Sequence, residues 1–248
     1  MKPDPSTRRR RLAVHAGLAV LSGTLYFLGF AGFNHWYFAP LAFVPFAELL
    51  RRVDTGKAAF WFGWLMGTIT HLGGYYWIPA TLTKFGGFPL PLSLLMDVAL
   101  CSWGGLSFGL LAWGLKRWWM AGGKPFPSLA VAVVFIEFAY PLLFPSYLAN
   151  SFWEIPVLIQ VSDLGGPLLL SAVTVFTSTA LWLLLRWKFC GEPFPRVPLL
   201  VAGGLVLATI AYGLVRIPQV DENQENAPSL RIGLVQAEAQ TRAALELA

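Results

Sequence analysis

Long apolar runs, each close to the length of a membrane-spanning helix, constrain this chain more than any other feature of its sequence. A helix needs about 20 mostly apolar residues to cross the roughly 30 Å core of a bilayer, because each residue adds about 1.5 Å. Seven such runs lie at residues 12–30, 36–50, 58–78, 90–115, 128–144, 164–185 and 198–215. The sequence therefore predicts an all-α polytopic membrane bundle of about seven transmembrane helices.

The first two runs differ from the other five. The first follows the basic stretch Arg8 to Arg11, as the core of a signal peptide would, but it is long for such a core. No clear Ala-x-Ala cleavage site follows it before His35, so we expect a retained first helix. The second run is short and contains Pro40 and Pro45, which predict a kinked or shallow helix whose carbonyls are satisfied by neighbouring groups.

Composition favours a membrane environment over water or nucleic acid. Hydrophobic residues make up 56% of the 248 residues and charged residues only 12%, whereas a soluble domain has about 25% charged residues. Lipid must then replace water around much of the surface, so membrane lipids are the first expected partner. The net charge of +5 comes from short clusters between apolar runs, without the basic stripe of a nucleic-acid-binding face, and no nucleic acid is expected.

The sequence predicts no cofactor, no metal site and no disulfide. Cys101 falls inside an apolar run and Cys190 in a basic loop, so the two thiols should lie at different depths and have no metal-ligand spacing. A Gly-x-x-x-x-Gly-Lys phosphate loop and a His-Glu-x-x-His zinc motif are both absent from the sequence.

The basic residues predict the orientation of the bundle, because Lys and Arg are retained on the cytoplasmic side when loops are short. Counting seven spans places 14 of the 18 basic residues on one side. These are Lys2, Arg8 to Arg11, Arg51, Arg52, Lys57, Lys116, Arg117, Lys124, Arg186, Lys188 and Arg196. We therefore expect a cytoplasmic N-terminus and a C-terminus on the opposite face.

A change of composition after Val215 divides the chain. Residues 1–11 form a basic cytoplasmic N-terminus, residues 12–216 the transmembrane bundle, and residues 217–228 a polar linker. Residues 229–236 then alternate apolar and polar side chains, as a strand would. One strand and a short tail cannot bury a core, so we expect residues 229–248 to be the incomplete start of a further domain.

Six segments follow one another along the chain: Leu28-Gly-Phe-Ala-Gly-Phe, Gly63-Trp-Leu-Met-Gly, Phe85-Gly-Gly-Phe-Pro, Glu137-Phe, Pro141-Leu-Leu-Phe-Pro-Ser-Tyr-Leu-Ala-Asn-Ser and Ile232-Gly-Leu-Val-Gln-Ala. In this order they resemble segments of the apolipoprotein N-acyltransferase family. The second and third resemble its third span and the loop after it, and the fourth and fifth resemble its outer loop. The last is similar to the strand that opens its α/β nitrilase-like (CN hydrolase) domain.

The resemblance implies an enzyme of the bacterial inner membrane with a periplasmic C-terminus. Such an enzyme moves an acyl chain from a phospholipid donor to the N-terminal diacylglyceryl-cysteine of an apolipoprotein acceptor. The family does this chemistry with Glu, Lys and Cys of the nitrilase-like domain, which would lie beyond Ala248, so no catalytic residue is carried over. Residues 1–248 alone are expected to be an inactive membrane scaffold; a small membrane transporter and a non-catalytic membrane interaction protein stay open as alternatives.

Two intramembrane acids are the first candidates for a functional site. Asp97 falls inside the run 90–115 and Glu137 inside the run 128–144, where an ionised side chain costs about 3 kcal/mol on translocon scales. Each acid is open to two interpretations. One is a structural hydrogen bond, with Ser93 and Cys101 as neighbours of Asp97, and the other is a contact with a lipid headgroup or substrate.

The outer loop adds three further substrate-facing or lipid-facing candidates, Tyr147, Asn150 and Gln160, through its resemblance to the family. His71 is interpreted as a neutral, hydrogen-bonded packing residue, since no acid or nucleophile lies near it in the sequence. Glu48 is expected to form an interfacial ion pair with the basic residues at positions 51 and 52.

Overall fold

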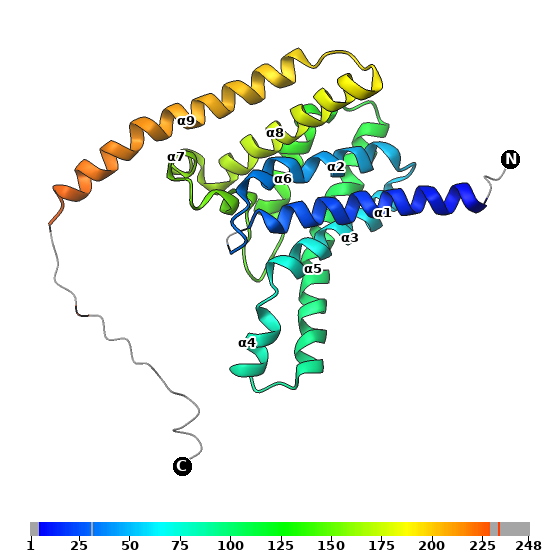
Figure 1. Ribbon diagram of the computed structural model, residues 1–248, viewed down its shortest axis with the longest axis horizontal. Helices are drawn as coiled ribbons and strands as arrows, with labels where there is room; N and C mark the ends of the chain where they lie inside the picture. Colours follow the sequence, from blue (N-terminus) through cyan, green and yellow to red (C-terminus); the bar gives the residue numbers. More distant parts are fainter. Residues whose placement is uncertain (1–4, 31, 229–232, 234–248) are drawn as a thin grey trace, which may run out of the picture.

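The computed structural model of the chain describes residues 5–30, 32–228 and 233, and within these residues it contains helices and no strands (Figure 1). The helices are α1 (Pro5–Leu28), η1 (Trp36–Phe38), α2 (Ala39–Arg52), α3 (Gly56–Gly74), α4 (Ile78–Lys84), α5 (Leu90–Met120), α6 (Pro125–Ala139), η2 (Leu148–Phe152), α7 (Pro156–Ile159), α8 (Ser162–Cys190) and α9 (Arg196–Glu225).

The predicted all-helical class is confirmed. A helix lies over each of the seven apolar runs: α1, α2, α3, α5, α6, α8 and α9. Within the described part of the chain, four of them are long and apolar enough to cross a membrane, namely α1, α5, α8 and α9. Helices α2 and α6 have 14 and 15 residues, fewer than the about 20 of a typical span.

Glycines bring α3 and α5 into close contact. A Cβ atom built on Gly63 would lie 2.5 Å from the Cβ of Ala112, and one built on Gly67 would lie 2.6 Å from the ring of Phe108. Neither position therefore has room for a side chain larger than that of glycine. The two glycines are one turn apart on α3, so they form the small-xxx-small contact surface that lets membrane helices approach closely.

Helix α2 lies between α1 and α8, and it contains Pro45 in its interior. Two backbone carbonyls in the first half of α2 accept hydrogen bonds from hydroxyl groups of these neighbours. The Oγ of Ser22 on α1 donates to the carbonyl of Ala42, and the Oγ of Ser178 on α8 lies 2.6 Å from the carbonyl of Pro40. Both carbonyls flank that of Leu41, which loses its helical partner to Pro45, so these hydroxyl groups bind beside the freed carbonyl and the predicted partner of that carbonyl stays a prediction.

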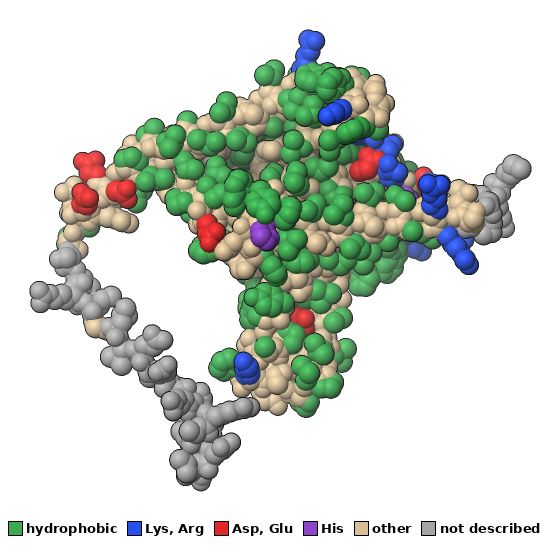
Figure 2. All heavy atoms as spheres, viewed as in Figure 1, with side chains coloured by type: hydrophobic (Ala, Val, Ile, Leu, Met, Phe, Trp, Pro, Cys, Tyr) green, Lys and Arg blue, Asp and Glu red, His purple; other side chains and the backbone are tan. Residues whose placement is uncertain are grey.

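Hydrophobic side chains cover most of the face drawn in Figure 2. Helix α9 is exposed along most of its length: Leu200 is 75% exposed and Leu207 is 68% exposed. Helix α4 and the first turns of α5 project from the rest of the bundle (Figure 1), and Phe85 between them is 86% exposed. A surface so apolar is suited to lipid, because soluble proteins rarely expose continuous apolar areas of this extent.

Helix α9 extends to Glu225, so it includes most of residues 217–228, where the sequence predicted a polar linker. Pro218 lies inside this helix. The predicted first strand, within residues 229–248, lies outside the described residues except for Gly233.

Candidate functional site

Glu137 lies in the last turn of α6 and points into the protein. Its Oε1 accepts a hydrogen bond from the backbone N–H of Leu148 at 2.8 Å and lies 3.4 Å from the hydroxyl oxygen of Tyr26. Its Oε2 is buried and has no hydrogen-bond partner among the described residues. None of the ion pairs in the described part of the chain includes Glu137. A buried carboxylate without a cation costs free energy in a membrane, and the hydrogen bond from the N–H of Leu148 offsets part of that cost.

The contact with Glu137 fixes the start of η2. The first N–H groups of a helix have no partner within the helix. In η2, the N–H of Leu148 donates to Glu137 and the N–H of Ala149 donates to the Oγ of Ser171 on α8 at 3.1 Å. Both residues are buried, at 0% and 4% exposure. Helices α6 and α8 therefore hold η2 from two sides; we call this region, residues 137–161 with Ser171, the η2 end of the bundle.

A small cavity of about 20 Å³ lies beside Glu137 and is also lined by His71, Thr70 and Ser107. This volume is sufficient for one water molecule. The Nδ1 of His71 lies 2.7 Å from the carbonyl oxygen of Gly67, so Nδ1 carries the hydrogen that it donates. The structure thus supports the interpretation of His71 as a hydrogen-bonded packing residue, and it also brings His71 into the same cavity as Glu137.

Besides Glu137, three of the predicted site residues lie at the η2 end. Tyr147 directly precedes η2 and is half-buried, Asn150 is exposed within η2, and Gln160 follows α7. The carbonyl of Tyr147 accepts the N–H of Asn150 at 3.0 Å. Among the described residues none of these three side chains has a hydrogen-bond partner.

Asn34 binds the η2 end from the segment after α1, and the sequence analysis missed it. It has φ +60°, in the left-handed region that Asn tolerates better than most residues. Its side-chain amide donates to Glu154 at 3.0 Å and accepts from the indole of Trp153 at 3.1 Å. The segment after α1 is thereby tied to the segment after η2. An Asn between Phe and His after a helix indicates a turn, but nothing in the sequence indicates these partners.

Asp97 shares neither a cavity nor a hydrogen bond with Glu137. It lies on α5 near α4, is 5% exposed, and its only hydrogen-bond partner in the described part of the chain is the thiol of Cys101 at 3.5 Å. The other expected neighbour, Ser93, instead accepts from the hydroxyl of Thr83 at 3.1 Å. The structure therefore separates the two acids that the sequence grouped as candidates.

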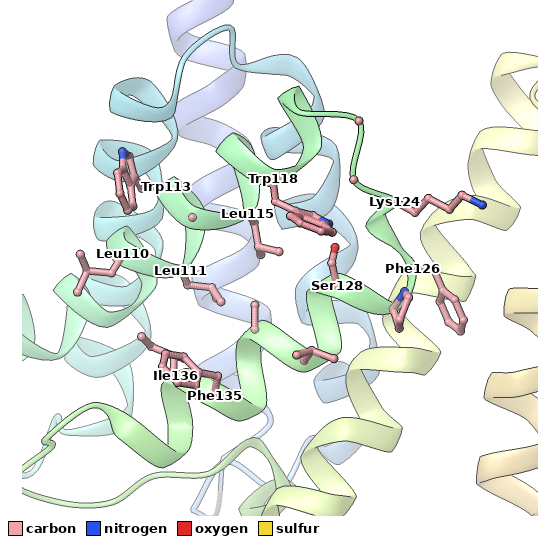
Figure 3. Close-up of a pocket in the computed structure, with 16 residues that line it drawn as sticks. Leu110, Leu111, Trp113, Leu115, Trp118, Lys124, Phe126, Ser128, Phe135 and Ile136 are labelled. Atoms are coloured by element: carbon pink, nitrogen blue, oxygen red, sulfur yellow. The ribbon is translucent and has the colours of Figure 1, made fainter.

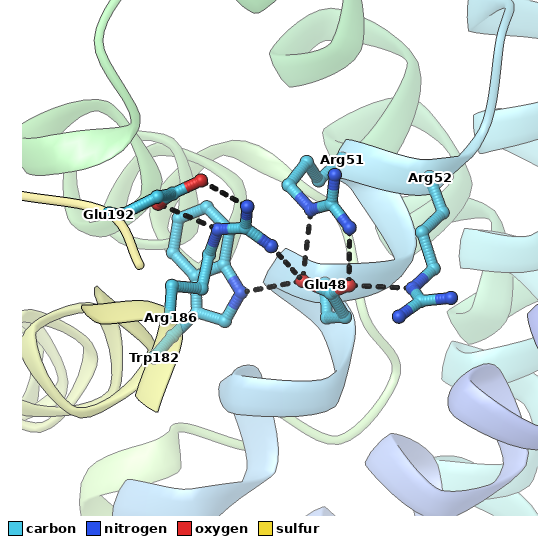
Figure 4. Close-up of polar contacts among 6 residues, drawn as sticks. All are labelled: Glu48, Arg51, Arg52, Trp182, Arg186 and Glu192. Carbon is cyan, nitrogen blue, oxygen red and sulfur yellow. Dashed lines mark hydrogen bonds and ion pairs between the residues drawn. The ribbon is translucent and has the colours of Figure 1, made fainter. Parts of the chain in front are cut away.

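A charged cluster occupies the other ends of α2 and α8 (Figure 4). Glu48 accepts hydrogen bonds from Arg51 at 2.7 Å and from Arg52 at 2.6 Å, as the sequence predicted. It also accepts from the indole of Trp182 and from Arg186, both at 3.1 Å. Arg186 pairs in addition with Glu192. We call these six residues the arginine cluster.

The loop residue of the arginine cluster is Glu192, between α8 and α9. Hydrogen bonds from Arg186 hold the pKa of the Glu192 carboxyl below its usual value. Its carboxylate form is therefore part of the folded cluster.

A wide apolar groove of about 960 Å³ lies between α5 and α6. In Figure 3, Leu111 and Leu115 of α5 face Phe135 and Ile136 of α6 across it. Lys124 lies at one end, with its side chain extending away from the groove (Figure 3). Apart from Lys124 and Ser128, the groove is lined by apolar and aromatic side chains and glycines, as a surface that contacts acyl chains would be.

Long apolar helices and a surface rich in exposed hydrophobic side chains define this chain as a polytopic helical membrane protein. Comparison with known proteins then gives the family. The family described as "Apolipoprotein N-acyltransferase N-terminal domain" matches residues 22–180. The chain belongs to the apolipoprotein N-acyltransferase family.

Curated relatives agree with this assignment. An apolipoprotein N-acyltransferase of Geobacter metallireducens is 30% identical over 211 residues, which cover 81% of this chain and 39% of the relative. One of Bdellovibrio bacteriovorus is 25% identical over 189 residues, which cover 73% of this chain and 34% of the relative. The chain thus spans well under half the length of the curated relatives that it matches.

Proposed function

We propose that residues 1–248 form the membrane scaffold of an apolipoprotein N-acyltransferase. The enzyme would transfer an acyl chain from a phospholipid to the N-terminal diacylglyceryl-cysteine of an apolipoprotein. Membership of the family carries this proposal, since its match includes most of the helical bundle. The apolar groove between α5 and α6 and the exposed surface of α9 are consistent with a protein surrounded by acyl chains.

In the proposed arrangement, seven helices cross the bacterial inner membrane, with residues 1–11 in the cytoplasm and residues 217–248 in the periplasm. Helices α2, α3 and α6 would then cross the membrane together with the four long helices. The arginine cluster would face the cytoplasm, which agrees with the preference of Lys and Arg for that side. The η2 end would face the periplasm, where residues 229–248 would begin the nitrilase-like domain.

The chemistry would lie outside residues 1–248. A Cys thiolate of the nitrilase-like domain would take the acyl group from the phospholipid, and the amine of the lipoprotein would then attack the thioester. The role of the scaffold is to hold the η2 end in a fixed position beneath that domain. Tyr147, Asn150 and Gln160 would face substrate or lipid there, and Glu137 would act as a positioning residue through the N–H of Leu148.

The test compares residues 1–248 with a longer chain that includes the nitrilase-like domain. Both are purified, supplied with phospholipid and a diacylated lipopeptide, and assayed for acylation of the lipopeptide amine by mass spectrometry. We expect turnover from the longer chain and none above background from residues 1–248. Turnover by residues 1–248 alone would refute the scaffold role, and a longer chain without activity would refute the proposed reaction.

A further inference from the structure

A second groove, of about 420 Å³, lies between α1, α2 and α8. Its walls are apolar and include Leu21 and Leu25 of α1 and Leu41 and Val44 of α2. At one end the groove is lined by residues of the arginine cluster. An apolar channel that ends at positive charge matches the shape of a lipid, in which an acyl chain joins a headgroup.

The arginine cluster has an excess of positive charge. Three guanidinium groups face two carboxylates, and Glu48 is fully occupied by hydrogen bonds from Arg51, Arg52, Trp182 and Arg186. Of these donors, Arg52 binds Glu48 only through Nε. Its two terminal nitrogens have no partner among the described residues, and they point away from Glu48 in Figure 4.

The arginine end of this groove, where the headgroup would lie, is far from the η2 end. Arg186 follows Ser171 by 15 residues on the same helix, which corresponds to about 22 Å at 1.5 Å per residue. A lipid held at the arginine cluster is therefore not the acyl donor of the proposed reaction.

We propose that the groove between α1, α2 and α8 binds an anionic phospholipid, with its phosphate on the free nitrogens of Arg52 and one acyl chain along Leu25, Leu41 and Val44. Guanidinium groups bind phosphate through paired, charge-assisted hydrogen bonds. Basic pockets between membrane helices on the cytoplasmic side bind anionic headgroups in the same way. The proposal rests on the membrane placement given above and does not depend on acyl transfer.

The experiment measures which lipid the purified chain retains. Residues 1–248 are extracted in mild detergent, exposed to equal amounts of phosphatidylglycerol and phosphatidylcholine, and examined by native mass spectrometry. We expect retention of phosphatidylglycerol in preference to phosphatidylcholine. Arg52→Gln should retain roughly fivefold less, the factor that one basic side chain contributes near an anionic surface.

Arg117→Gln is the matched control, because Arg117 is exposed near the same end of the bundle and packs over Trp113 outside the groove. It should retain as much phosphatidylglycerol as the unmodified chain. Equal losses in the two variants, or equal retention of the two lipids, would overturn the proposal.

A second variant tests the acyl chain. Leu41 is 39% exposed and lines the groove, so Leu41→Trp should fill the groove from its open side without disturbing the core. We expect it to lower retention while Arg52 is intact. Undiminished retention would show that only the headgroup binds, and that result would contradict the proposed site. Thermal unfolding of each variant confirms that it is folded, and no lipopeptide is present, so the result is independent of acyl transfer.

Discussion

Two carboxylates hold the two ends of this bundle together in opposite ways. At the arginine cluster, Glu48 is surrounded by guanidinium groups and an indole. At the η2 end, Glu137 has a backbone N–H and a tyrosine hydroxyl, and no cation among the described residues. Glu48 thus balances the charge of the guanidinium groups, whereas Glu137 fixes a backbone segment. Substitutions at the two sites should separate these roles.

The largest effect is expected at the arginine cluster. Glu48→Ala leaves Arg186, which is 9% exposed, without one of its two carboxylate partners and removes the common partner of Arg51 and Arg52. Because Glu48 is partly exposed and Arg186 keeps Glu192, the cost should lie between the about 1 kcal/mol of an exposed pair and the about 3–5 kcal/mol of a fully buried one. We expect a marked fall in the thermal unfolding temperature in detergent, followed by circular dichroism.

The control for Glu48→Ala is Asp54→Asn, at the exposed ion pair with Arg11, whose side chains are 72% and 50% exposed. An exposed pair contributes about 0–1 kcal/mol. A similar fall in unfolding temperature in the two variants would show that the cluster contributes no more stability than an exposed surface pair.

The next effect is expected at Glu137. Glu137→Leu leaves the buried N–H of Leu148 without an acceptor, which costs about 1–3 kcal/mol. Glu137→Gln keeps an acceptor oxygen and should be more stable than Glu137→Leu. In the longer enzyme, Glu137→Gln should reduce acyl transfer more than His71→Gln does, as measured by initial rates. An unchanged rate for Glu137→Gln would reduce Glu137 to a structural role without changing the family assignment.

A smaller effect is expected at the partner of Ala149. Ser171→Ala removes the hydroxyl that accepts this N–H, and a single hydrogen bond of this kind contributes about 1 kcal/mol. Hydrogen exchange should therefore rise in η2 while α3 and α5 stay protected. Ser102→Ala, a hydroxyl removal in the middle of α5, is the control and should leave exchange in η2 unchanged. Protection of η2 in both variants would mean that α6 alone holds this segment.

The smallest effect concerns pH. Because Arg186 lowers the pKa of Glu192 in the folded protein, Glu192 contributes stability above its unfolded pKa of about 4.3, and this contribution is lost as the pH falls through the lower folded value. Glu192→Gln should therefore make the unfolding temperature less sensitive to acid below about pH 4. Glu154→Gln, which removes an exposed carboxylate at the η2 end, serves for comparison. Identical acid sensitivity of Glu192→Gln and the unmodified chain would contradict this role.

Sequence patterns located the helices well, because apolar runs of suitable length leave few alternatives in a membrane. The pairing of Glu48 with Arg51 and Arg52 was predictable, since residues three and four apart share a helix face. Arg186 was not, because it lies 138 residues from Glu48 in the sequence. The same limit hid the cavity shared by His71 and Glu137.

The end of α9 was also missed, for a different reason. Apolar character stops near Val215, but Gln, Glu and Val continue the helix to Glu225 with Pro218 inside it. Hydrophobicity thus indicated where the apolar part of the helix ends and did not indicate where the helix itself ends.

The hydroxyl contacts on α2 have a consequence for synthesis. Ser22 is made before α2, but Ser178 emerges 138 residues after Pro40, its partner. At a synthesis rate of about 5–20 residues per second, Ser178 is added roughly 7 to 28 s after Pro40, and the contact forms only then. During this time α1, α3 and α5 are the long helices already made that contact this short, proline-containing segment. The two hydroxyl contacts of α2 therefore form in two stages, with α1 early in synthesis and with α8 only after residue 178 has been added.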